Sequence, residues 1–326
     1  MIASADRDAL VSLLADRVEF GVPLARHTSL RIGGPADALA TPADRDELAR
    51  LLALCHARGL PTRVLGAGFN VLVREGGLRG VVLRLKKLRG IERTEPDAIH
   101  VEAGASHSTI TRFCVTHGLA GLEFGAGIPG TLGGWLAMNA GIGSRELKDV
   151  VREIELLDRT GRTLPPRGRA ELDFRYRALD GLPEGAVLVA ATLAVTPSER
   201  EAVQAEIDRL LARRQATQPT DVPSCGSVFR NPPGDFAGRL IEAAGLKGAR
   251  EGAAEISTVH ANFIVNHGGA TARDVLRLIE RARETVARAT GIELEPEVRV
   301  LGEAVDPDDA VDGAGTAALS REGDRS

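Results

Sequence analysis

Aromatic residues are scarce in this sequence, which has one Trp, one Tyr and eight Phe among 326 residues. Proteins that bind single-stranded nucleic acid stack the bases on aromatic side chains, so this scarcity argues against such a function. The net charge of −4 also lacks the basic excess of a general nucleic-acid-binding protein. We therefore expect no nucleic-acid partner.

Cysteine is also rare. Cys55, Cys114 and Cys225 are far apart and odd in number, which predicts neither a disulfide framework nor a zinc site. The seven histidines include no HExxH motif and no convincing ligand spacing. The sequence therefore predicts a protein without a bound metal.

Long apolar runs are missing as well. No segment approaches the roughly 18 apolar residues of a membrane span. The charged, amphipathic stretch 1–20 lacks the basic start and the continuous apolar core of a signal peptide. We expect a cytoplasmic protein without a membrane partner, and a monomer by default. The length predicts two or three domains, and an apolar content of 43% is sufficient for a core.

Glycine, by contrast, is concentrated in residues 121–143, which read GLEFGAGIPGTLGGWLAMNAGIG. The other residues of this stretch are mostly apolar or small, unlike those of a polar Gly/Ser linker. Glycine lacks the Cβ that would keep a ligand away, and exposed peptide N–H groups can bind a pyrophosphate. The stretch predicts a cofactor cradle, and a buried glycine-rich turn without a ligand is the alternative.

Gly125, Gly127 and Gly130 match the dinucleotide-binding GxGxxG pattern. That pattern is meaningful only between a strand and a helix, and Gly121–Phe124 is too short for a good strand. Pro129 lies inside the motif and has no N–H to donate. We therefore do not interpret it as a Rossmann loop. A second glycine turn, Gly66–Asn70, lies between two apolar segments and is predicted to form another wall of the cradle.

Hydrophobic spacing predicts a strand-rich chain with inserted helices, followed by a compact α+β part after about residue 198. Helices are predicted over 6–17, 44–58 and 106–117. Two more helices are predicted after capping residues. One follows the capping box at Ser198 and Glu201, with Val203, Ile207, Leu210 and Leu211 inward, and the other follows Thr271 and Asp274. Strands are predicted over 62–73 (broken by the glycine turn), 81–85, 99–104, 150–157, 186–195, within 255–266 and over 296–301.

Several segments in order resemble those of the UDP-N-acetylenolpyruvoylglucosamine reductases, bacterial flavoenzymes of peptidoglycan precursor synthesis. The four main segments are HTSLRIGGPAD (27–37), LGAGFNVLV (65–73), GIPGTLGGWLAMNAG (127–141) and PSCGSVFRNP (223–232). AGLKG (244–248), HANFIVN (260–266) and EPEVRVLGE (295–303) extend the resemblance over nearly the whole chain apart from the tail.

The resemblance implies an α+β fold with a two-part FAD-binding region of the vanillyl-alcohol-oxidase (PCMH) type, followed by a C-terminal α+β substrate-binding domain. The implied parts are FAD-binding subdomain 1 at 1–80, FAD-binding subdomain 2 at 81–197 and the substrate-binding domain at 198–303. The Asp/Gly/Ala-rich composition of 304–326, without hydrophobic periodicity, predicts a disordered tail. Ligands are expected where such parts meet.

The resemblance also implies a reaction. NADPH reduces a non-covalently bound FAD, and hydride then passes from FAD N5 to C3 of the enolpyruvyl double bond of UDP-N-acetylglucosamine enolpyruvate. Protonation at C2 gives UDP-N-acetylmuramate. NADPH and the sugar nucleotide are expected to occupy one cleft in turn.

Three residues match the catalytic positions of the family. They are Ser227 in CGSVFRNP as the proton donor, Arg177 in DFRYR beside the substrate carboxylate, and Glu297 in EPEVR as the acid that assists at the enolate. Hydride addition at C3 places negative charge on C2 and the carboxylate, which such groups can stabilise. Arg175 competes with Arg177, and the Tyr-Arg pattern of the family favours Arg177.

The resemblance places the FAD pyrophosphate between the two glycine loops. The implied cofactor-binding residues are Gly66, Ala67, Gly68, Phe69, Asn70, Gly127, Ile128, Pro129, Gly130, Thr131, Gly133, Gly134 and Asn139. The implied substrate contacts are Tyr176, Asn231 and Lys247. Phe69 departs from the family, which usually has a serine there, so a hydroxyl contact would be lost.

Two other functions are weighed against this one: an FAD-dependent alcohol oxidase of the same fold, and a flavin-binding relic without activity. The set Ser227, Arg177 and Glu297 argues against both, and the sequence has no usual signature for covalent flavin attachment. The only tyrosine, Tyr176, lies inside the Arg177 motif. The chain therefore resembles the subgroup that lacks a lid-loop tyrosine.

Overall fold

The computed structural model describes residues 2–305 of the chain. The chain forms two compact units, each built from separate stretches of sequence. Unit 1 comprises Met1–Gly21, Asp37–Ala67 and Arg79–Ala216, and unit 2 comprises Val22–Ala36, Gly68–Leu78 and the chain from Thr217 onward.

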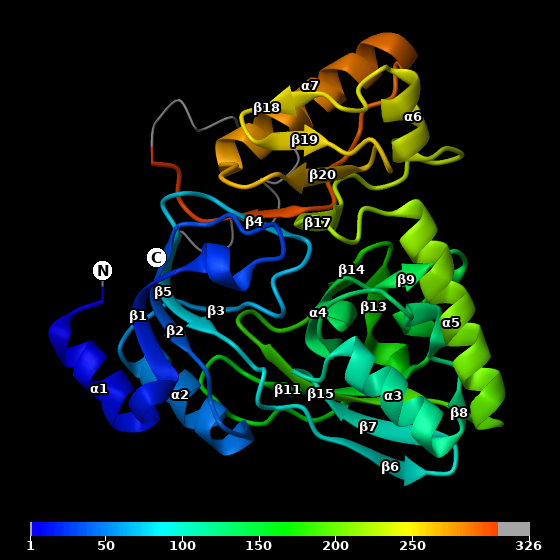
Figure 1. The fold of residues 1–326 in the computed structure, drawn as a ribbon. Coiled ribbons are helices and arrows are strands. Elements are labelled where there is room, and N and C mark those ends of the chain that lie inside the picture. Colours follow the sequence, from blue (N-terminus) through cyan, green and yellow to red (C-terminus); the bar gives the residue numbers. More distant parts are fainter. Residues whose placement is uncertain (1, 306–326) are drawn as a thin grey trace. The chain divides into compact units, whose positions relative to one another are not determined.

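Unit 1 is built on two sheets and most of the helices (Figure 1). The strand order is β1-β2-β5-β3 in one sheet and β12-β11-β15-β7-β6 in the other. Wholly or for the greater part, unit 1 contains α1 (Ser4–Leu14), β1 (Val18–Pro23), β2 (Pro35–Ala40), α2 (Arg45–Ala57), β3 (Thr62–Val64), β5 (Leu78–Leu83), β6 (Ile91–Glu95), β7 (Ala98–Glu102), α3 (His107–His117), β8 (Leu119–Ala120), α4 (Leu132–Ala137), β9 (Gly141–Ile142), β10 (Arg145–Glu146), β11 (Val151–Leu157), β12 (Arg167–Gly168), β13 (Asp173–Arg175), β14 (Ala178–Asp180), β15 (Val187–Ala194), β16 (Thr196–Pro197) and α5 (Arg200–Thr217). Its short 3-10 helices are η1 (Ala15–Arg17), η3 (Glu123–Gly125), η4 (Leu147–Asp149) and η5 (Arg169–Glu171).

Local sequence signals explain the helices α2 and α3. The Asp44 side chain caps α2 by accepting a hydrogen bond from the Glu47 amide at 2.8 Å. The Ser106 hydroxyl accepts a hydrogen bond from the Thr109 amide and caps α3, and Gly118 ends that helix in the left-handed conformation. The helices predicted over 44–58 and 106–117 are therefore confirmed to within a residue at each end.

Strand β15 contributes to two of the apolar cores of unit 1. Val187 and Val189 pack with the buried leucines of α1 and α2. Ala191 and Leu193 pack in a second core with residues of α3 and α4. The alternation predicted over 186–195 is confirmed, because all four of these side chains are buried.

Unit 2 is a four-stranded sheet, β17-β20-β19-β18, with two helices and a separate parallel pair, β21-β4 (Figure 1). Its elements are η2 (Leu24–His27), β4 (Val71–Val73), β17 (Ser224–Ser227), α6 (Ala237–Ala243), β18 (Arg250–Glu251), β19 (Ala254–Ile256), β20 (Phe263–Asn266), α7 (Ala272–Thr290) and β21 (Arg299–Leu301). The capping box predicted at Thr271 and Asp274 is present. The apolar stripe of α7 is buried in the core of the unit, as predicted.

The apolar segment 62–73 forms two strands on either side of the glycine turn, β3 and β4, as predicted, and they belong to different sheets. Three other features differ from the sequence-based expectation. The glycine-rich stretch contains the short helix α4, which its glycine content did not indicate. Helix α5 begins at Arg200, so Glu199 precedes it, one position beyond the predicted cap at Ser198. Leu211 was predicted to point inward and is 43% exposed.

The two compact units cross the predicted domain boundaries at residues 80 and 198. Leu30 and Leu72, from the predicted first subdomain, are buried in the core of unit 2. Helix α5, the predicted start of the third domain, packs Val203 and Ile207 against Ala126 of unit 1. Capping and turn signals mark where an element begins but not which core its apolar face joins. The part of the predicted tail that follows Val305 lies outside the described residues.

The three cysteines are free thiols, and all are buried. Between residues 2 and 305, no helix has both the length and the apolar content that crossing a membrane requires.

The cap of α7 allows a stability test. Thr271→Ala removes the hydroxyl that accepts a hydrogen bond from the Asp274 amide at 3.1 Å. We expect the free energy of unfolding of unit 2 to fall by about 1 kcal/mol, because the amide loses its partner at a helix end. The measurement is the urea midpoint, with Thr271→Ser as the control that retains the hydroxyl. An unchanged midpoint for Thr271→Ala would show that the cap contributes nothing.

Candidate functional site

Two glycine loops that are far apart in the sequence meet within unit 1. A Cβ built on Gly66 would lie only 3.1 Å from Thr131 Oγ1, so a larger residue at 66 would crowd the Thr131 side chain. The second loop is fixed to the segment after β7, because the Gly133 amide donates to the Ala103 carbonyl at 2.9 Å. The proximity of residues 66 and 131 agrees with the predicted cradle.

The loop 127–131 has the backbone that its glycines permit. Gly127 and Gly130 have φ values of +83° and +122°, which side-chain-bearing residues rarely adopt. The 3-10 turn η3 precedes this loop, where a Rossmann loop would follow a strand. The prediction that this segment is not a Rossmann loop is therefore confirmed.

Asn139 is fully buried and joins the glycine-rich stretch to two hairpins. Its Nδ2 donates to Glu146 Oε2 at 3.0 Å and to the Arg175 carbonyl at 2.9 Å. Its Oδ1 accepts a hydrogen bond from the Lys148 amide at 3.0 Å. Both N–H donors of the side chain are therefore used within the protein, and the cofactor contact expected of Asn139 stays a prediction.

Arg177 lies after β13 in the left-handed conformation, with φ of +59°. Its Nη2 donates to the Gly141 carbonyl at 3.3 Å, and its Nη1 lies 3.7 Å from Glu146 Oε1. The guanidinium also lies over the ring of Tyr176, 4.8 Å from the ring centroid. A guanidinium held by three neighbours is oriented in advance for a carboxylate ligand.

Arg175, the competing arginine, has different surroundings. Its side chain is 67% exposed and forms ion pairs with Asp173 at 2.9 Å and Asp180 at 3.4 Å. The side chain of Arg177 is only 19% exposed. The structure therefore favours Arg177 as the arginine that a ligand would meet in a desolvated setting.

In unit 2, Ser227 ends strand β17 beside an irregularity in the ladder. The pairing of β17 with β20 shifts register between Ser224 and Ser227, and Gly226 in between has φ of +86°. Such a bulge re-aims the side chain that follows it. The segment of Glu297 runs alongside, because the Glu297 amide donates to the Val228 carbonyl at 2.7 Å. Two predicted catalytic residues 70 positions apart in sequence are thus close neighbours along hydrogen-bonded backbone.

Asn70 connects strand β17, which ends at Ser227, to the segment of Glu297. Its amide donates to the Cys225 carbonyl at 3.1 Å, and its Nδ2 donates to the Glu297 carbonyl at 3.2 Å. Its own carbonyl accepts a hydrogen bond from the Arg299 amide at 3.1 Å. Sequence reasoning assigned Asn70 to the cofactor and did not anticipate this role within unit 2.

The remaining predicted contacts of unit 2 already have protein partners. Asn231 Oδ1 accepts a hydrogen bond from the Ala237 amide at 3.1 Å at the start of α6. Lys247 Nζ lies 2.8 Å from Glu242 Oε1. Phe69 is 39% exposed.

Burial raises the pKa of the Cys225 thiol to about 12, so that it stays protonated near neutral pH and is a poor nucleophile.

Sequence reasoning missed a set of buried donors around the glycine loops of unit 1. Arg84 Nη1 and Trp135 Nε1 are buried and have no hydrogen-bond partner within the described part of the chain. The Cδ of Arg214 lies 2.7 Å from where a Cβ on Gly127 would be. Burial lowers the pKa of both the Arg84 and the Arg214 guanidinium groups. The signal in the sequence was the single charge within the apolar run VVLRL.

These donors fit an anionic ligand at the glycine loops. Buried cations without a carboxylate partner are costly, and a bound phosphate would offset that cost. Gly66 has no Cβ, so at this close approach its backbone faces the second loop directly. The residues present therefore match the pyrophosphate of a dinucleotide cofactor, the group expected there from the sequence.

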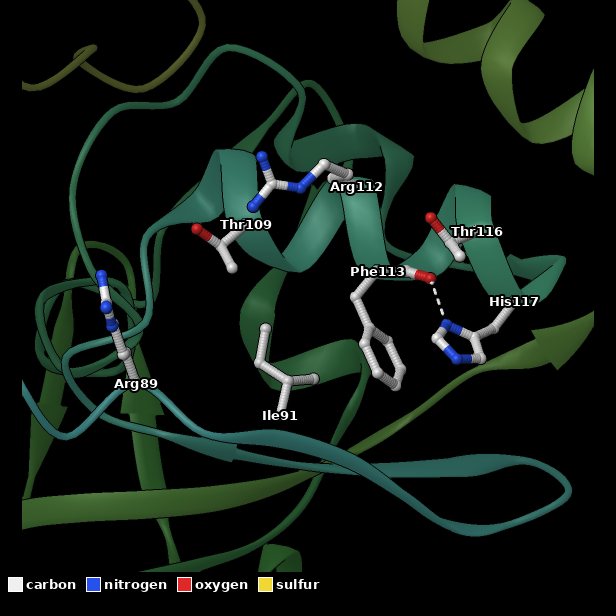
Figure 2. A pocket seen from close by; sticks show the side chains of 7 residues that line it. All are labelled: Arg89, Ile91, Thr109, Arg112, Phe113, Thr116 and His117. Carbon is white, nitrogen blue, oxygen red and sulfur yellow. Dashed lines mark hydrogen bonds between the residues drawn. The ribbon is translucent and has the colours of Figure 1, made fainter.

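A cavity of about 350 Å³ in unit 1 has a different lining. It lies between α3 and the start of β6, and Figure 2 shows the residues around it: Arg89, Ile91, Thr109, Arg112, Phe113, Thr116 and His117. The Phe113 ring stacks on His117 with 4.0 Å between the ring centroids. None of the predicted site residues lines this cavity, so it is separate from the glycine loops.

Comparison with known protein families gives two matches. The C-terminal domain of UDP-N-acetylenolpyruvoylglucosamine reductase matches residues 218–301. An FAD binding domain matches residues 36–165. The predicted fold class, an α+β FAD-binding region followed by a C-terminal domain, is confirmed by these matches and by the structural likeness below.

Individual relatives agree over most of the chain. A UDP-N-acetylenolpyruvoylglucosamine reductase of Methylococcus capsulatus is 52% identical, over 86% of this chain and 92% of its own length. One from Anaeromyxobacter dehalogenans (strain 2CP-C) is 48% identical, over 91% and 92%. The crystal structure of the Thermus caldophilus reductase superimposes with a TM-score of 0.76 at 36% identity, covering 87% of this chain and 98% of that one.

The buried amide of Asn139 provides a test of how the site is held. Asn139→Ala removes three hydrogen bonds and leaves the Lys148 amide and the Arg175 carbonyl without their partner. We expect the free energy of unfolding to fall by on the order of 3 kcal/mol. The urea midpoint measures it. Asn231→Ala, which loses one hydrogen bond at a helix end, is the control, with an expected loss of about 1 kcal/mol. Equal losses in the two variants would contradict the role given to Asn139.

Proposed function

The chain belongs to the UDP-N-acetylenolpyruvoylglucosamine reductase family and is a flavin-dependent oxidoreductase, and from this premise we propose its reaction. The enzyme reduces UDP-N-acetylglucosamine enolpyruvate to UDP-N-acetylmuramate, with NADPH as the electron donor. The reaction takes place in the cytoplasm, as a step of peptidoglycan precursor synthesis.

The observation that carries this proposal is the hydrogen-bonded arrangement around Asn70 in unit 2. Asn70 bonds to the Cys225 and Glu297 carbonyls and so fixes the strand of Ser227 against the segment of Glu297. A hydroxyl and a carboxyl on adjacent backbone segments form a pair that can protonate one carbon and stabilise the enolate beside it.

The cofactor FAD is assigned to the glycine loops. Gly66, Gly127, Gly130 and Thr131 would hold its pyrophosphate, with Arg214 as a nearby cation. When bound and reduced, FAD supplies the hydride that adds to C3 of the enolpyruvyl group. The contribution of the loops is to bind and orient the cofactor, since peptide N–H groups at glycine leave room for phosphate oxygens.

Arg177 is assigned to the substrate carboxylate. Its guanidinium is held by the Gly141 carbonyl and by Glu146, so it can bind a carboxylate without being immobilised anew. Negative charge grows on that carboxylate as the double bond is reduced. The contact with Arg177 therefore strengthens in the transition state, which lowers the barrier.

Ser227 is assigned the proton that goes to C2. A serine hydroxyl is a weak acid, so it must act by its position against a strongly basic carbon. The bulge at Gly226 fixes the direction of the hydroxyl. Glu297 supports the enolate from the neighbouring backbone segment.

A direct experiment tests the proposal. The purified full-length protein is examined for a flavin absorbance spectrum, and NADPH oxidation is followed with and without UDP-N-acetylglucosamine enolpyruvate. We expect bound flavin and NADPH oxidation that depends on the sugar nucleotide. Absence of flavin would contradict the proposal. Rapid turnover with oxygen and an alcohol would instead support the alcohol oxidase function.

Replacing Ser227 separates the two half-reactions. In Ser227→Ala, reduction of the flavin by NADPH is expected to continue at the wild-type rate, because that step needs no proton from this hydroxyl. Product formation is expected to fall by about 10²- to 10⁴-fold. Stopped-flow absorbance measures the first step, and chromatography of the sugar nucleotide measures the second. The matched control is Ser224→Ala on the same strand, and equal loss of both steps in Ser227→Ala would indicate a structural role.

Arg177 and Arg175 are compared in a second pair of variants. Arg177→Met is expected to lower product formation by about 10²- to 10³-fold, since it removes a charge that stabilises the transition state. Arg175→Met loses only exposed ion pairs, which are worth little, and should change the rate less than about threefold. Steady-state rates of UDP-N-acetylmuramate formation decide the matter. A larger loss in Arg175→Met would transfer the role to Arg175.

A further inference from the structure

Arg84 lies beside the first glycine loop of unit 1. Strands β3 and β5 are parallel neighbours with Val64 opposite Leu83, and the Leu65 amide donates to the Leu83 carbonyl at 3.0 Å. Arg84 and the Leu65–Gly66 segment therefore leave the sheet at the same edge. Carboxyl ends of parallel strands are where open sheets bind their ligands.

The segment after Arg84 also contacts the support of the second glycine loop. A Cβ on Gly104 would lie 1.8 Å from the Leu85 carbonyl oxygen, so the two backbones touch there. The adjacent Ala103 carbonyl accepts the hydrogen bond from the Gly133 amide. Arg84 is thus flanked by the two loops that are predicted to hold a pyrophosphate.

The side chain of Arg84 points away from the apolar core shared with α1 and α2. Val81 and Leu83 are buried in that core. Because side chains alternate along a strand, Val82 and Arg84 face the opposite side of the sheet. On that side Arg84 Nη1 is completely buried and makes no hydrogen bond to any residue that the structure describes.

A guanidinium with a buried nitrogen that has no partner costs free energy unless a ligand supplies the missing acceptor. A methionine of similar length would fit the apolar run VVLRL at lower cost. The charge at this position is therefore explained by an anion that binds there. The planar guanidinium matches two phosphate oxygens at once, which suits a pyrophosphate.

We propose that Arg84 is a cofactor-binding residue whose guanidinium neutralises the FAD pyrophosphate between the two glycine loops. The proposal rests on the proposed function, because it takes FAD as the ligand of these loops. It adds a residue that the family motifs quoted above do not include. It also assigns opposite effects to one side chain, which lowers the stability of the flavin-free protein and raises the affinity for FAD.

The test uses the full-length chain freed of flavin. FAD is titrated into wild type, Arg84→Met and Arg84→Lys, and the dissociation constant is read from the change in flavin fluorescence. We expect Arg84→Met to bind FAD about 10- to 100-fold more weakly, the usual range for loss of a hydrogen bond to a charged group. Arg84→Lys should lie in between, because it retains the charge without the planar fork.

Thermal unfolding of the same flavin-free proteins gives the second measurement. Arg84→Met should melt at the same temperature as wild type or higher, since a buried unpaired charge has been removed. Arg112→Met is the matched control: Arg112 is an exposed arginine at the α3 cavity, and its replacement should leave both quantities unchanged.

The outcomes are distinct. Unchanged FAD affinity in Arg84→Met would overturn the proposal, and so would a lower melting temperature of the flavin-free variant, which would mark a structural role. If wild type itself fails to bind FAD, the proposed function fails. If wild type binds FAD and forms product while Arg84→Met retains full affinity, only the assignment of Arg84 fails.

Discussion

The buried side chain of Asn139 is the interaction on which the candidate site of unit 1 depends. Its amide binds the carboxylate of Glu146 and the carbonyl of Arg175, and its oxygen binds the amide of Lys148. Glu146 in turn lies against the guanidinium of Arg177. Through Glu146, Asn139 therefore supports the orientation of the arginine assigned to the substrate.

Unit 2 repeats this arrangement with a second asparagine. Asn70 and Asn139 both adopt positive φ, of +55° and +39°, a conformation that asparagine tolerates better than most residues. Each follows a run of glycines, and each uses its side-chain amide to hold a neighbouring segment. The glycines shape the loops, and the asparagines attach the loops to the segments that carry Arg177, Ser227 and Glu297. In each motif, the glycines thus form the loop predicted to bind a ligand, and the asparagine holds that loop in place by hydrogen bonds.

The sequence predicted the features that local signals determine. Hydrophobic spacing located α2 and α3, which the structure shows to be capped by Asp44 and Ser106, and the capping box at Thr271 located α7. The ordered family motifs indicated the fold class. The sequence did not predict α4, because glycine content masks a helix that tertiary packing of Trp135 stabilises. Nor could it show that both N–H donors of Asn139 would bond within the protein, or that Arg84 would have a buried nitrogen without a partner among the described residues. The hydrogen bonds of Asn139 depend on Glu146, Lys148 and Arg175, and the packing beside Arg84 depends on Gly104, all brought close by the tertiary fold.

Strand β6 closes one edge of the five-stranded sheet, and β12, only two residues long, closes the other. Four of the five residues of β6 are exposed, and Glu92, Arg93 and Glu95 among them carry charge. A strand from another molecule that paired with β6 would have to place its backbone beside those charged side chains. At the other edge, β12 is too short to provide more than a few hydrogen bonds to an added strand. Both ends of the sheet therefore oppose edge-to-edge association, which protects a chain of this β content from aggregation at high concentration.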